Sequence, residues 1–256
     1  AKIDERLSVN AGDAQRLLAD AADLLADATH CAAFSCALAD AGDVIQGVQL
    51  IPAGGGRAML VMLTAGGRIK SSICRLSCPA DDGFMAAFYD VMHSTFIGTR
   101  LSDVSIATVQ STAVTLGSRI FDMLPVLSSL CALCAETRQD SLLFAGETNL
   151  LSHEELGNEV YKLLTFLTNR PRFLTLAKQF ADAPARSALF IGEENPYFEL
   201  KNTATMLCSL HYNSQQRAVL GVIGSTRMDY ATIVPRAQYI MNKTTDLLAE
   251  GGITNG

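Results

Sequence analysis

Apolar residues recur at helical spacing near the start of the chain. Between residues 13 and 28 they occupy one face while aspartates occupy the other, which predicts an amphipathic helix. Three short apolar runs come next, and glycine turns at Gly54-Gly55-Gly56 and Gly66-Gly67 separate them. We therefore predict three strands joined by tight turns. These strands are expected at 44–51, 57–64 and 68–76.

The middle of the chain shows mostly helical periodicity. Asp81 and Asp82 precede a predicted helix through Phe84, and a longer helix is expected from 103 to 123. Pro125 should break or kink that helix, because proline lacks the N–H that a helix interior needs. Two sets of leucines then share helical faces and are candidates for either core or a dimer seam. They are Leu127, Leu130 and Leu133, and Leu156, Leu163 and Leu167.

The strand pattern returns in the last third of the chain. One isolated strand-like run lies at 141–146, and further strands are expected at 187–192, 203–212 and 217–223. Residues 213–216 should turn the last two strands into a hairpin with a four-residue loop. A final helix follows, so the pattern predicts an α+β chain of two lobes, in which a helical block interrupts one domain.

Composition narrows the class of protein. The 256 residues are 49% hydrophobic and 18% charged, which is typical of a well-packed globular chain. The longest apolar runs, such as 58–63, fall short of the roughly 20 residues that a membrane helix needs. The cysteines number seven and are scattered, so we expect a reduced, cytoplasmic setting.

Charge bears on nucleic-acid binding. The chain has 20 Lys and Arg against 26 Asp and Glu, a formal net charge of −6. Because neutralisation of phosphates by basic side chains supplies most nucleic-acid affinity, we do not expect these residues to hold DNA strongly by themselves.

Candidate reactive groups favour structural roles. Cys131 and Cys134 form a CxxC. A zinc site would need a second cysteine pair or histidines at ligand spacing. The two cysteines lie on an apolar helical face, where cysteine packs as a small hydrophobe. Gly54-Gly55-Gly56 joins two strands and is predicted to be a hairpin loop, since a phosphate cradle normally leads into a helix. The histidines accompany no nucleophile motif; they are His30, His93, His153 and His211. We therefore expect no catalytic residues, no metal and no cofactor.

The most informative segment runs from Val219 to Tyr230. An apolar strand leads into Gly224, which permits a turn, and Thr226-x-x-Asp229 has the pattern of a capping box that opens a helix. The string GVIGSTRMDY within it resembles the signature GVIGPTRMDY of the heat-inducible transcription repressor family, HrcA. Ser225 stands where that family usually has proline, and serine can cap the same helix.

Other segments resemble the same family in the same order. Residues 191–195 resemble its IGxEN element, 144–151 its GTxNLL element, and 47–52 with 57–61 its paired central strands. The signature residues, to which we assign a structural or coupling role, are Gly192, Glu194, Asn195, Gly221, Gly224, Thr226, Arg227, Met228, Asp229 and Tyr230. Arg227 has two open interpretations: an ion pair that ties a carboxylate, or part of a face that meets a DNA-binding head or a partner.

The resemblance implies an architecture and a function. It implies a GAF-like antiparallel sheet with flanking helices, in two parts at 1–117 and 185–256, around a mostly helical dimerising insertion at 118–184. It implies a homodimer that represses heat-shock chaperone operons and binds an inverted-repeat operator through a winged helix-turn-helix absent from this chain. A GroEL-type chaperonin is an implied partner. The alternative function is a GAF-like module that senses a small molecule, with pocket residues from the strands near 44–76.

Overall fold

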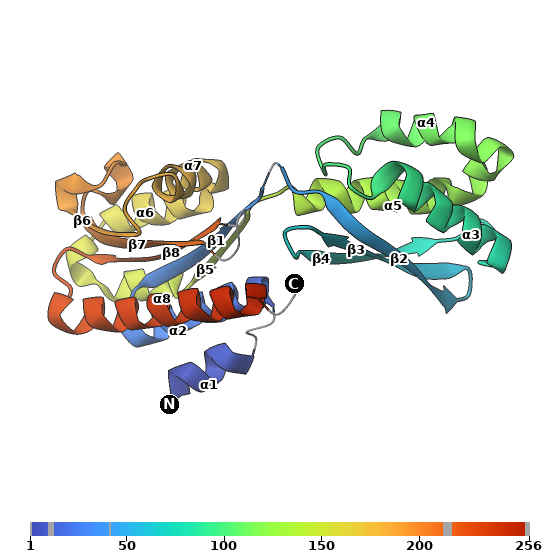
Figure 1. Cartoon of the computed structure of the whole chain (residues 1–256). Coiled ribbons are helices and arrows are strands. Elements are labelled where there is room, and N and C mark those ends of the chain that lie inside the picture. The colour runs from blue at the N-terminus through green and yellow to red at the C-terminus, as the bar shows by residue number, and fades with distance from the viewer. Residues whose placement is uncertain (1, 10–12, 41, 212–216, 254–256) are drawn as a thin grey trace. The chain divides into compact units, whose positions relative to one another are not determined.

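The computed structural model describes residues 2–9, 13–40, 42–211 and 217–253. They form two compact units, which are described separately (Figure 1). We call Ala1–Leu38 together with Asp140–Gly256 the body, and Ala39–Gln139 the insert.

A five-stranded antiparallel sheet forms the centre of the body. Its strands lie in the order β5-β1-β8-β7-β6, so β1 pairs with both β5 and β8. The strands are β1 (Ala32–Leu38), β5 (Ser141–Ala145), β6 (Ser187–Ile191), β7 (Thr203–His211) and β8 (Arg217–Ser225). The predicted α+β class, with an antiparallel sheet and flanking helices, is confirmed.

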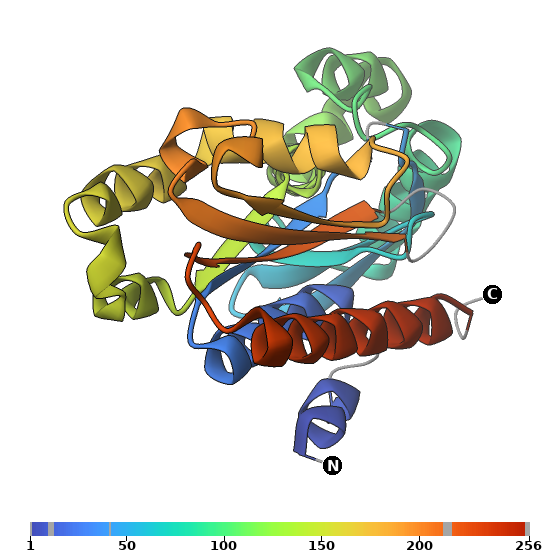
Figure 2. The ribbon, with the colours of Figure 1, turned by 90° about the vertical axis from the view of Figure 1, so that its left-hand side faces the viewer.

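Helices cover both faces of this sheet (Figures 1 and 2). One face packs against α2 and α8, and the other packs against α6 and α7. Because side chains alternate along a strand, β1 sends Ala33 to the first core and Phe34 to the second. The helices are α1 (Lys2–Val9), α2 (Ala14–Thr29), α6 (Glu159–Thr168), α7 (Arg170–Ala181) and α8 (Tyr230–Ile253).

Short 3₁₀ turns complete the body. They are η3 (Glu147–Ser152), η4 (Glu154–Leu156), η5 (Gly192–Glu194) and η6 (Phe198–Leu200). Phe173 of α7 lies at the centre of an aromatic cluster beneath them, with its ring centroid 4.7 Å from Phe34, 5.0 Å from Phe144 and 5.7 Å from Phe166.

The insert is a three-stranded sheet with helices on one face. Its strands are β2 (Ile45–Gly54), β3 (Arg57–Thr64) and β4 (Ile69–Arg75), in the order β2-β3-β4. Its helices are α3 (Asp82–Val91), continued by the π-helix η1 (Met92–Phe96), then α4 (Ile106–Leu116), η2 (Gly117–Arg119) and α5 (Ile120–Thr137). Gly54, Gly55 and Gly56 all have positive φ and connect β2 to β3, so the predicted hairpin loop is confirmed.

The predicted boundaries of the insertion, 118–184, differ from those of the insert. The strand and helices after Asp140 belong to the body, because β5 pairs with β1 and because α6 and α7 cover the body sheet. The predicted boundaries differ because the sequence pattern did not predict β1, the strand with which β5 pairs. All seven of its residues are buried, so it lacks the alternation of a half-exposed strand.

The long predicted helix at 103–123 is interrupted before Pro125. The break lies at Gly117, whose φ is +55°, and Pro125 is instead inside α5. By length and composition alone, Gly117–Thr137 could cross a membrane, contrary to the expectation from apolar runs. One face of α5 is nevertheless packed in the core of the insert, and Leu127, Leu130 and Leu133 lie on it.

The two final strands pair as predicted. β7 and β8 are antiparallel neighbours from Thr203↔Ser225 to His211↔Arg217. The predicted loop residues 213–216 lie outside the described part of the chain.

Candidate functional site

The signature segments meet at one end of the body sheet. β8 ends at Ser225, which pairs with Thr203 at the start of β7. Ile191, at the end of β6, pairs with the next residue of β7, Ala204. Segments 191–195 and 224–230 therefore lie close together.

The two glycines of β8 are required by close packing. A Cβ on Gly221 would lie 2.1 Å from Cε1 of Phe34, and a Cβ on Gly224 would lie 2.6 Å from Sγ of Cys31. A Cβ at position 224 would also approach Sδ of Met228 to 3.2 Å. Their role in the structure is close packing against side chains of the neighbouring strands β1 and β7, and against Cys31 and Met228.

The turn after β8 precedes the last helix rather than starting it. The Arg227 N–H donates to Oγ of Ser225 at 3.1 Å, and the Tyr230 hydroxyl donates to the Thr226 carbonyl at 2.8 Å. Helix α8 begins at Tyr230, and Oδ1 of Asp229 accepts from the Thr232 N–H at 3.3 Å. The predicted capping box at Thr226 is therefore wrong, because the cap is Asp229 and the segment before it forms a separate turn.

Asp229 should make the stability of the body depend on pH. The hydrogen bond from Thr232 lowers the pKa of Asp229 below its ordinary value of 3.8. The stabilisation is present above that value and is lost as the pH falls through the lowered pKa. We expect Asp229→Ala to lower the Tm by a few degrees at neutral pH, and the difference from the unmodified chain to narrow in strong acid. Thermal melts followed by circular dichroism across acidic pH measure this, and a constant difference would contradict it.

Segment 191–195 forms a tight polar turn. Gly192 has a φ of +59°, and Oε2 of Glu194 accepts from the Ile191 N–H at 2.9 Å. Nδ2 of the buried Asn195 donates to the carbonyls of Gly192 and Thr203, each at 3.0 Å. Oδ1 of Asn195 is buried, and within the described residues it has no hydrogen-bond partner. Glu194 and Asn195 thus hold the connection between β6 and β7.

A third segment closes the same end of the sheet. The Asn149 side-chain amide donates to the Cys31 carbonyl at 3.0 Å, and Nε2 of His153 lies 3.3 Å from the His30 carbonyl. Glu155 accepts from its own N–H and from the Ser225 hydroxyl, and these bonds lower the pKa of Glu155, with smaller contributions from the charges of His153 and Arg227. Residues 144–151 resemble a family element, but the roles of Asn149 and of the nearby Glu155 could not be predicted, because their partners are distant in sequence.

Arg227 projects from this end of the sheet as an exposed side chain. Among the described residues, no carboxylate lies within ion-pair distance of its guanidinium. Its positive charge nevertheless contributes to the lowered pKa of Glu155. The interpretation of Arg227 as an ion-pair partner is therefore not supported by the geometry. The polar surface at this end of the sheet consists of Thr226, Arg227 and Asp229, whose side chains do not pack in the core.

Cys131 and Cys134 of the CxxC lie in α5 of the insert. Burial raises the pKa of Cys134 to about 12, and its Sγ packs 3.6 Å from Sδ of Met62. A thiol with so high a pKa is a poor nucleophile and a poor metal ligand, in agreement with the packing interpretation.

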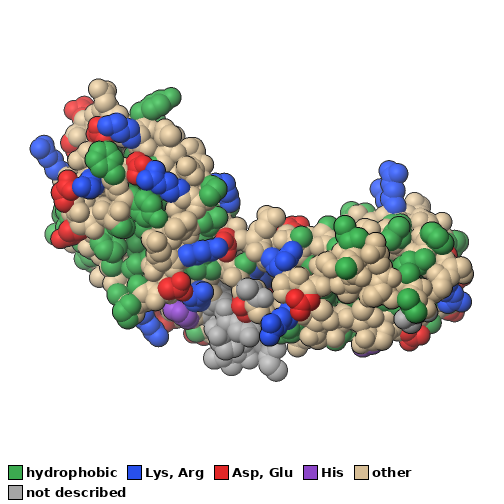
Figure 3. Space-filling model, turned by 90° about the horizontal axis from the view of Figure 1, so that it is seen from above, with side chains coloured by type: hydrophobic (Ala, Val, Ile, Leu, Met, Phe, Trp, Pro, Cys, Tyr) green, Lys and Arg blue, Asp and Glu red, His purple; other side chains and the backbone are tan. Residues whose placement is uncertain are grey.

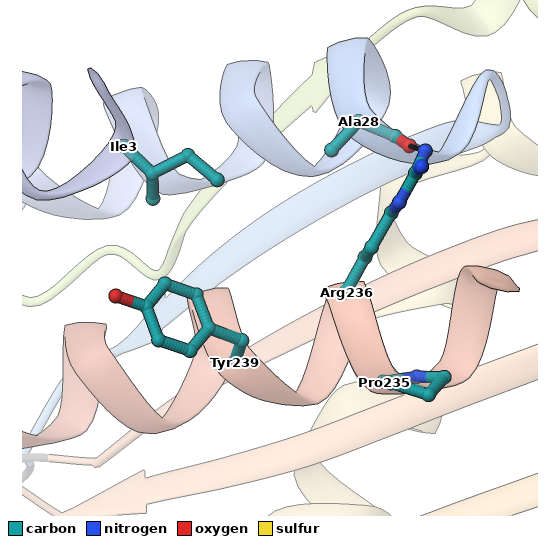
Figure 4. Close-up of a pocket in the computed structure, with 5 residues that line it drawn as sticks. All are labelled: Ile3, Ala28, Pro235, Arg236 and Tyr239. Carbon is teal, nitrogen blue, oxygen red and sulfur yellow. Dashed lines mark hydrogen bonds between the residues drawn. The ribbon is translucent and has the colours of Figure 1, made fainter. Parts of the chain in front are cut away.

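A cavity of about 430 Å³ lies between α1, α2 and α8 (Figure 4). Its lining is mainly apolar, and its polar groups already bond within the chain. Tyr239 donates from its hydroxyl to Oδ1 of Asp4 at 2.7 Å, and Arg236 donates to the Ala28 carbonyl at 3.3 Å. The cavity lies in the body, whereas the ligand-sensing alternative placed its pocket on the strands near 44–76.

Comparisons with known proteins agree with the signature. The family model for the HrcA protein C terminal domain matches residues 15–234. Relatives named heat-inducible transcription repressor HrcA include one from Methylobacillus flagellatus, 25% identical over 93% of this chain and 69% of its own length. Another, from Acetivibrio thermocellus, is 20% identical over 78% of this chain.

The chain spans only part of these relatives, 58% of the protein from Acetivibrio thermocellus. A crystal structure of a hypothetical protein at 2.2 Å resolution has the same fold, with a TM-score of 0.66 and 18% identity, over 93% of this chain and 68% of that one. The family model covers most of the sequence, including the Gly221–Tyr230 segment. The chain therefore belongs to the HrcA family.

Proposed function

We propose that this chain is the regulatory and dimerising part of a repressor of heat-shock genes. Its membership of the HrcA family and the names of its relatives support this. Operator DNA is assigned to a winged helix-turn-helix outside these residues, since their net charge of −6 is unsuited to phosphate contacts. Its site of action is then the cytoplasm, and its task is positioning rather than catalysis.

The homodimer is assigned to the insert. The two leucine sets that were candidates for a dimer seam are core residues. Exposed apolar side chains lie instead on α4 and the start of α5, namely Ile106, Val114, Phe121 and Leu124. No charged residue occurs from Val104 to Ser118, and the upper surface of the insert shows few charged side chains (Figure 3). A two-fold interface brings a patch against its own copy, and the uncharged α4 part of this patch does so without repulsion.

A GroEL-type chaperonin is the second proposed partner, which would assist the repressor into its active fold. The exposed apolar side chains of the insert support this, because such surfaces in incompletely assembled proteins promote association with other chains. A ligand-sensing function is not proposed, since the polar groups at the cavity of the body are already bonded within the chain.

Arg227 carries the most direct test of the repressor function. Loss of the gene should raise transcription of heat-shock operons at normal growth temperature, and the intact gene should restore repression. We assign the exposed Arg227 side chain to a face that contacts the DNA-binding head. Arg227→Ala should therefore restore repression poorly while leaving the Tm unchanged. Transcript quantification and thermal melts measure the two effects.

Arg186→Ala is the matched control, since Arg186 is also an exposed arginine of the body. It should repress normally. Full repression by Arg227→Ala would exclude the coupling role, whereas unchanged heat-shock transcripts in the strain lacking the gene would exclude the repressor function.

A further inference from the structure

The outer face of the insert sheet is apolar although none of the described helices of the insert covers it. Helices α3 and α5 pack against the other face (Figure 1). Strand register places Ile51, Met59 and Ile73 in one row across the three strands, and Leu63 beside Ile69 in another. The apolar side chains of this outer face are Ile51, Met59, Val61, Leu63, Ile69 and Ile73. Ile73 is 73% exposed and Ile69 is 68% exposed. The solvated face of an antiparallel sheet usually carries polar side chains at such positions.

The charge on this sheet is of one sign. No Asp or Glu occurs from Val44 to Ala80, while four basic residues do. Lys70 pairs with Glu136, and Arg68 donates to the Thr137 carbonyl, so these two are used within the insert. Arg57 and Arg75 lie directly opposite each other on β3 and β4 and are both exposed. Like charges in that position repel, and the described residues offer neither an ion-pair partner.

The size of the face limits what can cover it. All three strands pair over Arg57–Leu63 of β3, a length of about 25 Å, and three strands are about 14 Å wide, which gives a face of about 350 Å². A stable interface between two proteins buries about 800 Å² per partner, so a second copy packed on this face alone would be held weakly. An α-helix about 10 Å in diameter fits the width, and about 16 residues of it span the length.

We propose that the outer face of the insert sheet binds one amphipathic helix of a partner protein, about 16 residues long and acidic on its flanks. The apolar stripe of the helix covers the row Ile51, Met59 and Ile73. Its carboxylates neutralise Arg57 and Arg75 at the rim, which removes their mutual repulsion. The sheet then has helices on both faces, as in other layered α/β structures. This proposal is independent of the repressor function.

The test uses three labelled 16-residue peptides and the whole chain. The first carries leucines at positions i, i+3, i+4 and i+7 among glutamates, the second replaces the glutamates by lysines, and the third is the first with its order scrambled. Fluorescence anisotropy at about 50 and 300 mM salt separates the charge contribution by screening. We expect binding of the first peptide only, weaker at the higher salt.

Two sets of variants locate the site. Ile73→Asp and the double variant Arg57→Glu, Arg75→Glu should each weaken binding by about tenfold or more. Tyr161→Asp is the matched control, because Tyr161 is 81% exposed on α6 of the body, outside this face and outside the proposed dimer patch, and it should bind the peptide like the unmodified chain. Circular dichroism melts establish that each variant is folded.

Several results would overturn the proposal. They are the absence of binding, equal binding of the lysine or scrambled peptide, or unchanged binding by the folded Ile73→Asp and double-arginine variants. Sedimentation in which Ile73→Asp dissociates a dimer would identify the face as a contact between copies. Loss of binding to phosphatidylserine vesicles in the same variant, without peptide binding, would identify a lipid surface.

Discussion

Gly221→Val should unfold the body or bring it close to unfolding. The first added carbon would lie 2.1 Å from Cε1 and 2.4 Å from Cζ of Phe34, and 2.9 Å from Cδ2 of Leu207. Phe34 cannot retreat, because its ring packs edge-on against Phe173 with centroids 4.7 Å apart. Overpacking of a closed core usually costs about 1–3 kcal/mol, and three added carbons in this position should cost at least about 3 kcal/mol. Thermal and urea melts of the purified variant measure the loss.

Gly47→Val is the matched control for a strand glycine. Gly47 lies in β2, and a Cβ there would meet no atom within 4 Å, so this variant should keep its Tm. The double variant Phe34→Leu, Gly221→Ala should be more stable than Gly221→Ala alone, because the smaller side chain leaves room for the new methyl group. Equal stability of the two would show that Phe34 is not the obstacle.

Replacement of residues 39–139 by a short glycine-serine turn should leave a folded body. Ala37 of β1 pairs with Ser141 of β5, so the two ends are already adjacent antiparallel strands that a tight turn can join. Deletion of 118–184 should instead abolish folding, because it removes β5 and the helices α6 and α7 that cover Phe34. Circular dichroism and amide dispersion in NMR spectra distinguish the two products.

The same shortened chain tests where copies pair. With the insert removed, sedimentation should find a monomer, since the homodimer is assigned to the insert. A folded dimer would move the interface to the body, and an unfolded product would contradict the division of the chain into body and insert.

Local patterns were sufficient for the elements whose two faces differ. Helix α2 has aspartates on its outer face, and Asp13 caps it through the N–H groups of Gln15 and Arg16, so its start and face were both predictable. Strands β2 and β3 alternate buried and exposed positions and were predicted to within three residues. Strand β1 was not predicted, because its sequence Ala-Ala-Phe-Ser-Cys-Ala-Leu is buried throughout and is poor in the β-branched residues that are typical of strands. Without β1, the boundaries of the insertion could not be predicted correctly.

The candidate site shows the same limit. The turn at Gly224 followed from the end of the apolar strand in the sequence, whereas its proximity to segment 191–195 is a result of strand pairing. The need for glycine at position 221 depends on Phe34, and the role of Asn149 depends on the Cys31 carbonyl, 118 residues away. Contacts of that kind arise from tertiary packing, and one sequence contains no local signal for them.

The attachment of the insert to neighbouring strands constrains how the chain folds. Pairing of β1 with β5 closes a loop that contains Ala39–Gln139, and a flexible loop of that length costs about 4 kcal/mol of closure entropy. An insert that has already folded holds its own ends together and removes most of that cost. The central sheet is therefore expected to assemble late in folding, after the insert has condensed on its own core.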